Sequence, residues 1–198
     1  MSIVTVTSLD PAELPRSQRA RRDRIVAAAI ERLGHDEYDE VQMRHVAETA
    51  SVALATIYRY FSSKEHLYAA ALLAWAEAFP PDATPLRGAH TDEERLRALM
   101  RRAVRAFERY PQMMRAEIVI EHSSDPNARA LFDEFGRRNI AALRAALAST
   151  DPQRAAAIIE TVNAVMVTRL RSWALGRCAI RDVDRSVQSA IALIFERP

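Results

Sequence analysis

Signals that start a helix recur along this chain, and they constrain its fold more than any other feature of the sequence. One form is an Asp followed by Pro: the carboxylate caps the helix, and proline takes the first helical position, where a missing N–H costs nothing. The other is the capping box, in which a hydroxyl residue and a Glu three positions later each accept a backbone N–H. The signals are Ser62 with Glu65, Thr91 with Glu94, Asp125-Pro126, Asp151-Pro152 and a lone Asp182. We therefore expect a long succession of helices.

The composition favours helix and offers no clear strand. Only 4 of the 198 residues are Gly, while Ala, Leu, Arg and Glu, which favour helix, are abundant. No run of alternating β-branched residues is long enough to indicate a strand. Together with the apolar spacing, this predicts an all-α fold of about nine helices. Their expected ranges are 17–33, 42–50, 54–60, 63–79, 92–110, 112–122, 126–148, 152–176 and 183–196.

Several functional classes find no support in the sequence. Cys178 is the single cysteine, so an intrachain disulfide is impossible and a reducing compartment is expected. No apolar run approaches the ~18 residues of a membrane span, and the N-terminus lacks the apolar region of a signal peptide. The five His residues have no metal-ligand spacing, and no nucleophile–base pair is apparent. We expect a cytoplasmic protein that contacts no membrane, holds no metal or cofactor, and is not an enzyme.

Residues 43–62 have the pattern of a helix-turn-helix. Ala47 is small where the two helices would cross, and Ser51 occupies the turn, where Gly is usual because φ is often positive. A second helix that enters the major groove needs short or flat side chains at its N-terminus, and Leu54, Ala55 and Thr56 meet that need. The pattern indicates DNA binding, which the net charge of +2 alone is too small to show.

The stretch VQMRHVAETASVALATIYRYFSSKEHL (41–67) resembles the helix-turn-helix of TetR-family transcriptional repressors, chiefly through QMRHVA and TIYRYFSSKEHL. The remaining two thirds of the chain matches the family only in its pattern of linker, long helices and length. Within the family, the segments RRDRI, YDEVQMR, VA (52–53) and TIYRYF are similar to the repressors of steroid (cholesterol) catabolism in actinobacteria.

The resemblance implies a set of DNA contacts. It implies that Arg44 reaches a base edge or a phosphate from the first helix of the motif. The other implied contacts are bases for Leu54, Ala55 and Thr56, and phosphates for Tyr58, Tyr60, Lys64 and Gln42. Tyr60 has an alternative, in which its ring packs and its hydroxyl reaches outward. For the arginines of residues 16–24, a solvated helix face is an equal alternative to DNA contact.

The resemblance also implies a cavity for a small apolar or amphipathic effector, such as a steroid or an acyl-CoA catabolite. The C-terminal part is rich in large, adaptable apolar side chains, which suit either such a cavity or an ordinary core. The candidate lining residues are Trp75, Met100, Phe107, Met114, Ile118, Phe135, Asn139, Met166 and Trp173.

The resemblance further implies a homodimer on double-stranded operator DNA. Helices 152–176 and 183–196 have continuous apolar faces, so two copies can form a four-helix bundle. We expect a flexible tail (1–15), a DNA-binding domain (16–62) and a ligand-binding and dimerisation domain (63–198), with a linker at 80–91. The alternatives are an all-helical ligand carrier or enzyme, or a helical adaptor, whose likeness to a helix-turn-helix is fortuitous.

Overall fold

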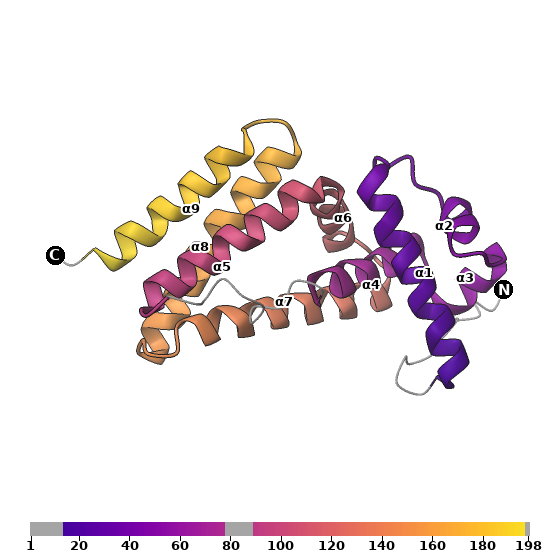
Figure 1. Ribbon diagram of the computed structural model, residues 1–198, viewed down its shortest axis with the longest axis horizontal. Helices are drawn as coiled ribbons and strands as arrows, with labels where there is room; N and C mark the ends of the chain where they lie inside the picture. Colours follow the sequence, from indigo (N-terminus) through magenta and orange to yellow (C-terminus); the bar gives the residue numbers. More distant parts are fainter. Residues whose placement is uncertain (1–13, 78–88, 197–198) are drawn as a thin grey trace. The chain divides into compact units, whose positions relative to one another are not determined.

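The computed structural model describes residues 14–77 and 89–196, and within them it contains nine α-helices and no strand (Figure 1). The expected all-α fold is therefore confirmed. The predicted tail and most of the predicted linker lie outside these residues. The helices are α1 (Arg16–His35), α2 (Met43–Thr49), α3 (Leu54–Tyr60), α4 (Lys64–Glu77), α5 (Asp92–Arg109), α6 (Pro111–Glu121), α7 (Pro126–Ala146), α8 (Pro152–Ala174) and α9 (Ile180–Phe195).

The chain forms two compact units. The first contains α1 to α4 together with residues 115–135, and the second contains α5, residues 111–114 of α6, residues 136–146 of α7, α8 and α9. The first unit thus includes α4, whereas the sequence assigned residues 63–198 to the second domain. The boundary between the DNA-binding and effector-binding domains, between residues 62 and 63, stays a prediction.

In the first unit, α1 packs against α2 and α4 (Figure 1). The buried residues Ile25, Ala29 and Leu33 recur along α1 at helical spacing and form its inner face. Helix α4 is buried almost all round, because residues 66–72 are all inside. A single substitution such as Ile57→Ala in α3, whose side chain is fully buried, would cost about 2–5 kcal/mol of stability.

The turn between α2 and α3 has the geometry that the sequence predicts. Ser51 has a φ of 53°, in the left-handed region. Its N–H donates to the carbonyl of Glu48 (3.1 Å), and the N–H of Val52 donates to the carbonyl of Ala47 (2.9 Å). This is a Schellman motif that ends α2, with Ser in the place that Gly usually takes.

Three of the predicted helix starts have the expected hydrogen bonds. Asp125 Oδ1 accepts the N–H of Asn127 (2.8 Å) at the start of α7. Thr91 Oγ1 accepts the N–H of Glu94 (3.2 Å), and Glu94 Oε2 accepts the N–H of Thr91 (3.0 Å), which completes the capping box of α5. Asp151 Oδ1 accepts the N–H groups of Gln153 and Arg154, both at 3.0 Å, at the start of α8.

Two other predicted caps were wrong by a few residues. Helix α4 is capped by Ser63, whose Oγ accepts the N–H of His66 (3.0 Å), and not by Ser62 in a box with Glu65. Helix α9 already begins at Ile180, so Asp182 lies in its first turn and accepts the N–H of Ala179 (3.2 Å). At α4, Ser63 also donates to Asp125 of a distant turn, whereas at α9 Asp182 accepts the N–H of the residue that precedes the helix instead of capping the helix itself.

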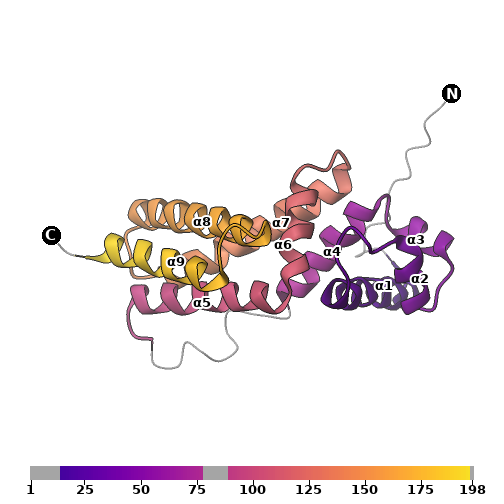
Figure 2. The same cartoon turned by 90° about the horizontal axis from the view of Figure 1, so that it is seen from above.

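In the second unit, α5, α8 and α9 lie side by side (Figures 1 and 2), with α9 against both of the others. Their core comprises Leu96, Met100, Leu143, Leu147, Ala155, Ile158, Ile159, Val162, Val187 and Ile191. Arg97 of α5 also donates from Nη1 to the carbonyl of Gln188 in α9 (2.9 Å). The α8–α9 turn is a second Schellman motif, here with Gly176 at a φ of 70°.

Candidate nucleic-acid interface

Helix α3 has two different faces. Ile57 and Tyr60 are buried, and Phe61 follows them into the core, so this side anchors the helix. The opposite side holds Leu54, Ala55, Tyr58 and Arg59, all exposed, and we refer to these four residues as the α3 outer face. Leu54 is 42% and Tyr58 47% exposed, so this face presents two large side chains to solvent.

Helix α2 adds exposed polar groups at its start. Gln42 precedes the helix, and Arg44 is in its first turn; both are exposed. The N–H of Gln42 donates to His45 Nδ1 (3.4 Å), and Arg44 Nε lies 3.3 Å from His45 Nε2. Both contacts are within the same helix end, and the Arg44 side chain is exposed.

Thr56 and Lys64 are half-buried. The Lys64 ammonium donates to the carbonyl of Tyr38 (3.0 Å) and lies 4.4 Å from the centre of the Tyr38 ring. Burial lowers the pKa of Lys64, against the opposing effects of Asp39 and Glu65. In this structure, therefore, Lys64 ties α4 to the loop between α1 and α2.

Tyr60 is 2% exposed, and its hydroxyl meets no hydrogen-bond partner within residues 14–77 and 89–196. The guanidinium of Arg59 lies 5.3 Å from the centre of the Tyr60 ring. The ring thus packs, as in one of the two alternatives for Tyr60, and its hydroxyl points inward rather than outward.

Arg59 is not among the contacts that the family resemblance implies, although the sequence offers it as a cation available for a phosphate. It directly follows Tyr58 and lies one helical turn beyond Ala55, and it is on the outer face. It is an exposed cation on the helix that the motif assigns to the groove.

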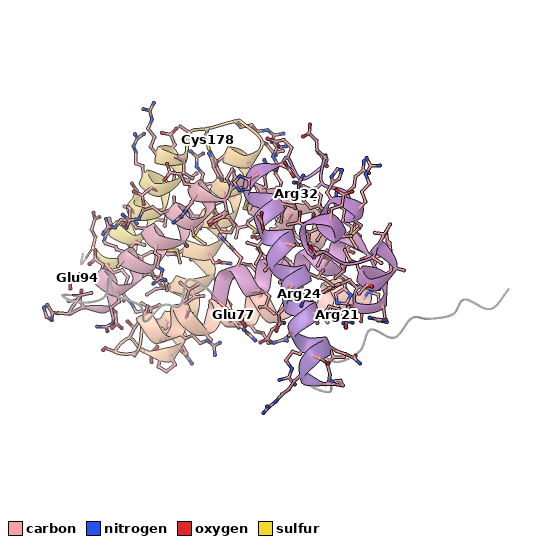
Figure 3. The ribbon with its side chains drawn as sticks, turned by 45° about the vertical axis from the view of Figure 1, so that its right-hand side comes forward. Arg21, Arg24, Arg32, Glu77, Glu94 and Cys178 are labelled. Atoms are coloured by element: carbon pink, nitrogen blue, oxygen red, sulfur yellow. The ribbon has the colours of Figure 1, made fainter. Side chains whose placement is uncertain are left out.

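The arginines of α1 divide into two kinds. Arg21 and Arg24 are exposed along the helix, as Figure 3 shows. Arg22 instead lies over the Phe61 ring at 5.1 Å, and burial lowers its pKa. Arg22 therefore packs on Phe61 at the end of α3, while Arg21 and Arg24 remain at the surface.

Two family models cover most of the chain. The model described as "Bacterial regulatory proteins, tetR family" matches residues 25–71, and "Tetracyclin repressor-like, C-terminal domain" matches residues 89–194. The chain belongs to the TetR family. The first match contains α2, α3 and the start of α4, and thus the exposed groups of α2 and α3 described above.

Relatives in the TetR family span nearly the whole chain. The HTH-type transcriptional repressor KstR of Rhodococcus jostii (strain RHA1) is 30% identical over 98% of this chain and 92% of its own length. KstR of Mycobacterium tuberculosis is also 30% identical, over 98% and 90%. These relatives are transcriptional repressors. The chain is likewise a TetR-type transcriptional repressor and not an enzyme, as the sequence predicts.

Solved structures of the family share the fold. A TetR transcriptional regulator from Rhodococcus sp. RHA1 superimposes with a TM-score of 0.71 at 27% identity, over 91% of this chain and 97% of that one. The regulator FadR from Bacillus subtilis, in complex with stearoyl-CoA, gives a TM-score of 0.67 over 88% of this chain and 99% of its own. Its identity is 16%, so it shows the common fold alone.

The nine candidate effector residues are distributed over both units. Trp75, Ile118 and Phe135 belong to the first unit, and the other six belong to the second: Met100, Phe107, Met114, Asn139, Met166 and Trp173. Met100 lies in the core of the second unit, and Met166 packs against that core. Trp75, Phe107, Met114 and Phe135 are also buried, and Ile118, Asn139 and Trp173 are half-buried.

The first unit has an open pocket of about 620 Å³. Of the nine candidates, Ile118 is the one that lines it. The remaining lining residues are Ser63, Glu65, Val119, His122, Ser123, Ser124 and Asp125.

Two searches of the described residues give negative results. Within residues 14–77 and 89–196, no helix is long and apolar enough to span a bilayer. In the same residues, no three His, Cys, Asp or Glu side chains are grouped so that they could hold a metal ion.

Proposed function

We propose that this chain is a homodimeric repressor that reads a palindromic operator with α3 and leaves it when an apolar or amphipathic effector binds. The observation that carries this proposal is the α3 outer face, which holds large side chains in solvent on a short, firmly anchored helix. Residues 16–62 would read DNA in the cytoplasm, and residues 63–198 would bind the effector and the second copy.

The chemistry of α2 and α3 suits the major groove. Leu54 and Ala55 can contact thymine methyl groups, and the half-buried Thr56 can offer its hydroxyl to a base edge. Arg44 has the fork that pairs with guanine O6 and N7. Tyr58 and Arg59, with Gln42 from α2, would contact phosphates and fix the register of the helix on the duplex.

Tyr60 and Lys64 would act less directly. The expected phosphate contact of Lys64 requires its ammonium to leave the Tyr38 carbonyl, and that of Tyr60 requires its ring to turn out of the core. We propose that both residues chiefly hold the motif in place. Lys64→Ala tests this, because loss of a phosphate contact reduces the salt dependence of DNA binding, whereas loss of a packing contact leaves it unchanged.

Dimerisation would use α8 and α9. Helix α8 leaves a stripe of small side chains exposed, which lets another helix approach closely: Ala157, Thr161, Ala164 and Thr168. Leu193 of α9 is 71% exposed and offers apolar area to a partner. Two copies related by a two-fold axis would present two α3 helices about 34 Å apart, one turn of DNA.

The effector would act by preferring one conformer. It can shift the protein off DNA only by its difference in affinity between the DNA-binding conformer and another one. The resemblance to repressors of steroid catabolism supports a steroid, or an acyl-CoA catabolite, as the effector. Asn139 is the polar residue among the nine candidates and would supply a polar contact to such a molecule.

The test is fluorescence anisotropy with DNA from the region upstream of the gene, at moderate salt, against a scrambled duplex of equal length. The repressor proposal requires tighter binding to the upstream DNA, which a steroid acid or its CoA thioester then reverses while it raises the melting temperature. Equal affinity for the two duplexes would support the ligand carrier or adaptor instead. If the protein binds the upstream DNA specifically but neither the steroid acid nor its CoA thioester reverses that binding, only the proposed class of effector would be refuted.

A further inference from the structure

One carboxylate joins two turns of the first unit. Asp125, just before α7, accepts hydrogen bonds at Oδ2 from the hydroxyl of Ser62 (2.6 Å) and from that of Ser63 (2.5 Å). The two serines form the turn between α3 and α4, more than 60 positions away in sequence. Burial alone would raise the pKa of Asp125, but the two hydroxyls, the N–H of Asn127 and the nearby His66 together lower it, so Asp125 is ionised at neutral pH.

The same carboxylate serves two helix starts. Asp125 Oδ1 accepts the N–H of Asn127 (2.8 Å) and so caps α7. Ser63, which donates to Oδ2, in turn caps α4 by accepting the N–H of His66. The N-terminal ends of α4 and α7, each with a partial positive charge, therefore meet at one negative charge.

A further set of contacts fixes the α3–α4 turn from its other side. The N–H of Ser62 donates to His66 Nδ1 (3.2 Å), so that nitrogen carries no proton. The His66 ring is 5% exposed and meets Phe61 edge-on, with ring centres 5.2 Å apart. The turn after α3 is thus held by α1, through Arg22 on Phe61, and by Asp125.

Capping alone does not explain the reach of Asp125. Asp151-Pro152 is the same dipeptide at the start of α8, and its carboxylate accepts N–H groups from Gln153 and Arg154 of its own helix. Within the described chain these are the hydrogen bonds that the Asp151 side chain makes. Asp125 makes the equivalent bond to its own helix and, in addition, holds two side chains of the turn that follows α3.

We propose that Asp125 is a positioning residue for operator recognition: by fixing Ser62 and Ser63, it sets how α3 presents its outer face to the major groove. This rests on the proposed function, since it assumes that α3 reads DNA. Direct readout is sensitive to small displacements, because bidentate hydrogen bonds to bases are strongly directional. Non-specific binding depends on net phosphate neutralisation and tolerates such displacements.

The experiment compares Asp125→Asn with the matched control Asp151→Asn. Asn caps a helix as well as Asp does, so α7 and α8 both keep their starts. The amide introduced by Asp125→Asn is uncharged, which removes the anionic acceptor shared by the two serines. Each variant is titrated with the specific duplex and with a scrambled duplex at several salt concentrations, and its folded fraction is measured by circular dichroism.

We expect Asp125→Asn to weaken specific binding roughly tenfold, the effect of losing about one charged hydrogen bond. Its affinity for the scrambled duplex and the slope of log K against log salt should stay unchanged, since no phosphate contact is lost. Asp151→Asn should leave all of these quantities unchanged. A proportional loss of specific and non-specific affinity, or equal effects of the two variants, would overturn the proposal.

Ser62→Ala provides a second route if Asp125→Asn does not fold. It removes one of the two donors to Asp125 and leaves the caps of α4 and α7 intact. It should also lower the affinity for the specific duplex and leave that for the scrambled duplex unchanged. The double variant with Asp125→Asn should bind the specific duplex about as weakly as Asp125→Asn does. An unchanged ratio of specific to non-specific affinity in Ser62→Ala would overturn the proposal. Absence of specific binding by the unmodified protein would instead refute the proposed function.

Discussion

Helices α3 and α9 both hold large apolar side chains in solvent, but the surroundings of those side chains differ. On α3, Leu54, Ala55 and Tyr58 share the exposed face with the cation of Arg59, so apolar surface and one positive charge lie within two turns. On α9, the exposed Leu193 follows two residues after Ile191, which is buried in the core of its unit. A mixed face suits a charged, grooved partner, and an aliphatic face beside small side chains suits another helix. Exposure alone therefore does not distinguish the two kinds of partner.

The largest effect on DNA binding is expected from a change at Leu193 of α9. Leu193→Glu places a charge in the proposed helix-on-helix contact, which should dissociate the dimer and weaken operator binding by at least about 100-fold, because one half-site remains. Analytical ultracentrifugation and anisotropy measure both quantities. Leu175→Glu is the control: Leu175 is 58% exposed but caps α8 in a turn. Loss of DNA binding from an intact dimer would contradict the assignment of Leu193.

Acid should lower the stability of the first unit, which contains His66. Burial, reinforced by Arg22 and opposed by Asp125, lowers the pKa of His66 from 6.5 to about 4. Between those pH values the unfolded chain binds a proton that the native chain does not, so stability falls as pH falls, by on the order of 2 kcal/mol. Each unit contains one tryptophan: Trp75 in the first and Trp173 in the second.

Single-tryptophan variants measure this acid response for each unit separately. Chemical denaturation followed by Trp75 should give a lower midpoint at pH 4.5 than at pH 7, and the shift should diminish in His66→Gln. A shift that persists in His66→Gln would assign the acid sensitivity to another group.

A smaller effect is expected at the tyrosines of α3. Tyr58→Phe should weaken binding to all sequences by about 0.5–1.5 kcal/mol, the value of one hydroxyl bond to a phosphate. Tyr60→Phe is the matched control, because it removes a buried hydroxyl without a partner in the described chain and should preserve or raise stability. If Tyr60→Phe weakened DNA binding more than Tyr58→Phe, the expected phosphate contact of Tyr60 would regain support.

The smallest effects are expected on stability, from substitutions in the two Schellman turns. Ser51→Gly should stabilise the protein by about 0.5–1 kcal/mol, since Gly adopts a positive φ without the steric cost that Ser bears. Gly176→Ser should destabilise it by a similar amount, because it introduces that cost after α8. Thermal unfolding of both variants measures the pair. Destabilisation by Ser51→Gly would show that the Ser51 side chain makes a compensating contact.

The helices could be predicted from the sequence because caps and apolar spacing act within a few residues. Thr91 with Glu94 and Asp151-Pro152 needed no information from elsewhere in the chain. The start of α4 was misplaced because Ser62 and Ser63 are both possible caps and both contact the distant Asp125. The start of α9 was misplaced because Asp182, at the third helical position, accepts a backbone N–H instead of capping the helix.

The site could be predicted in part. The motif located α2 and α3, and helical spacing separates exposed Tyr58 from buried Ile57. The direction of Lys64 depends on Tyr38, and the partners of Asp125 depend on how distant turns pack, so neither can be derived from local pattern. The effector residues could not be separated from core, because Met100 and Phe107 follow the same apolar spacing in either role.

The most direct test of operator recognition by α2 and α3 is a base-by-base substitution scan of the operator, with the unmodified protein and with Arg44→Ala. The unmodified protein should discriminate at two symmetric half-sites about one helical turn apart. Arg44→Ala should lose about 1–3 kcal/mol of discrimination at a single position in each half-site and keep the rest. Equal weakening of binding at every position would contradict base recognition by Arg44, and the absence of paired half-sites would contradict the dimeric reading of the operator.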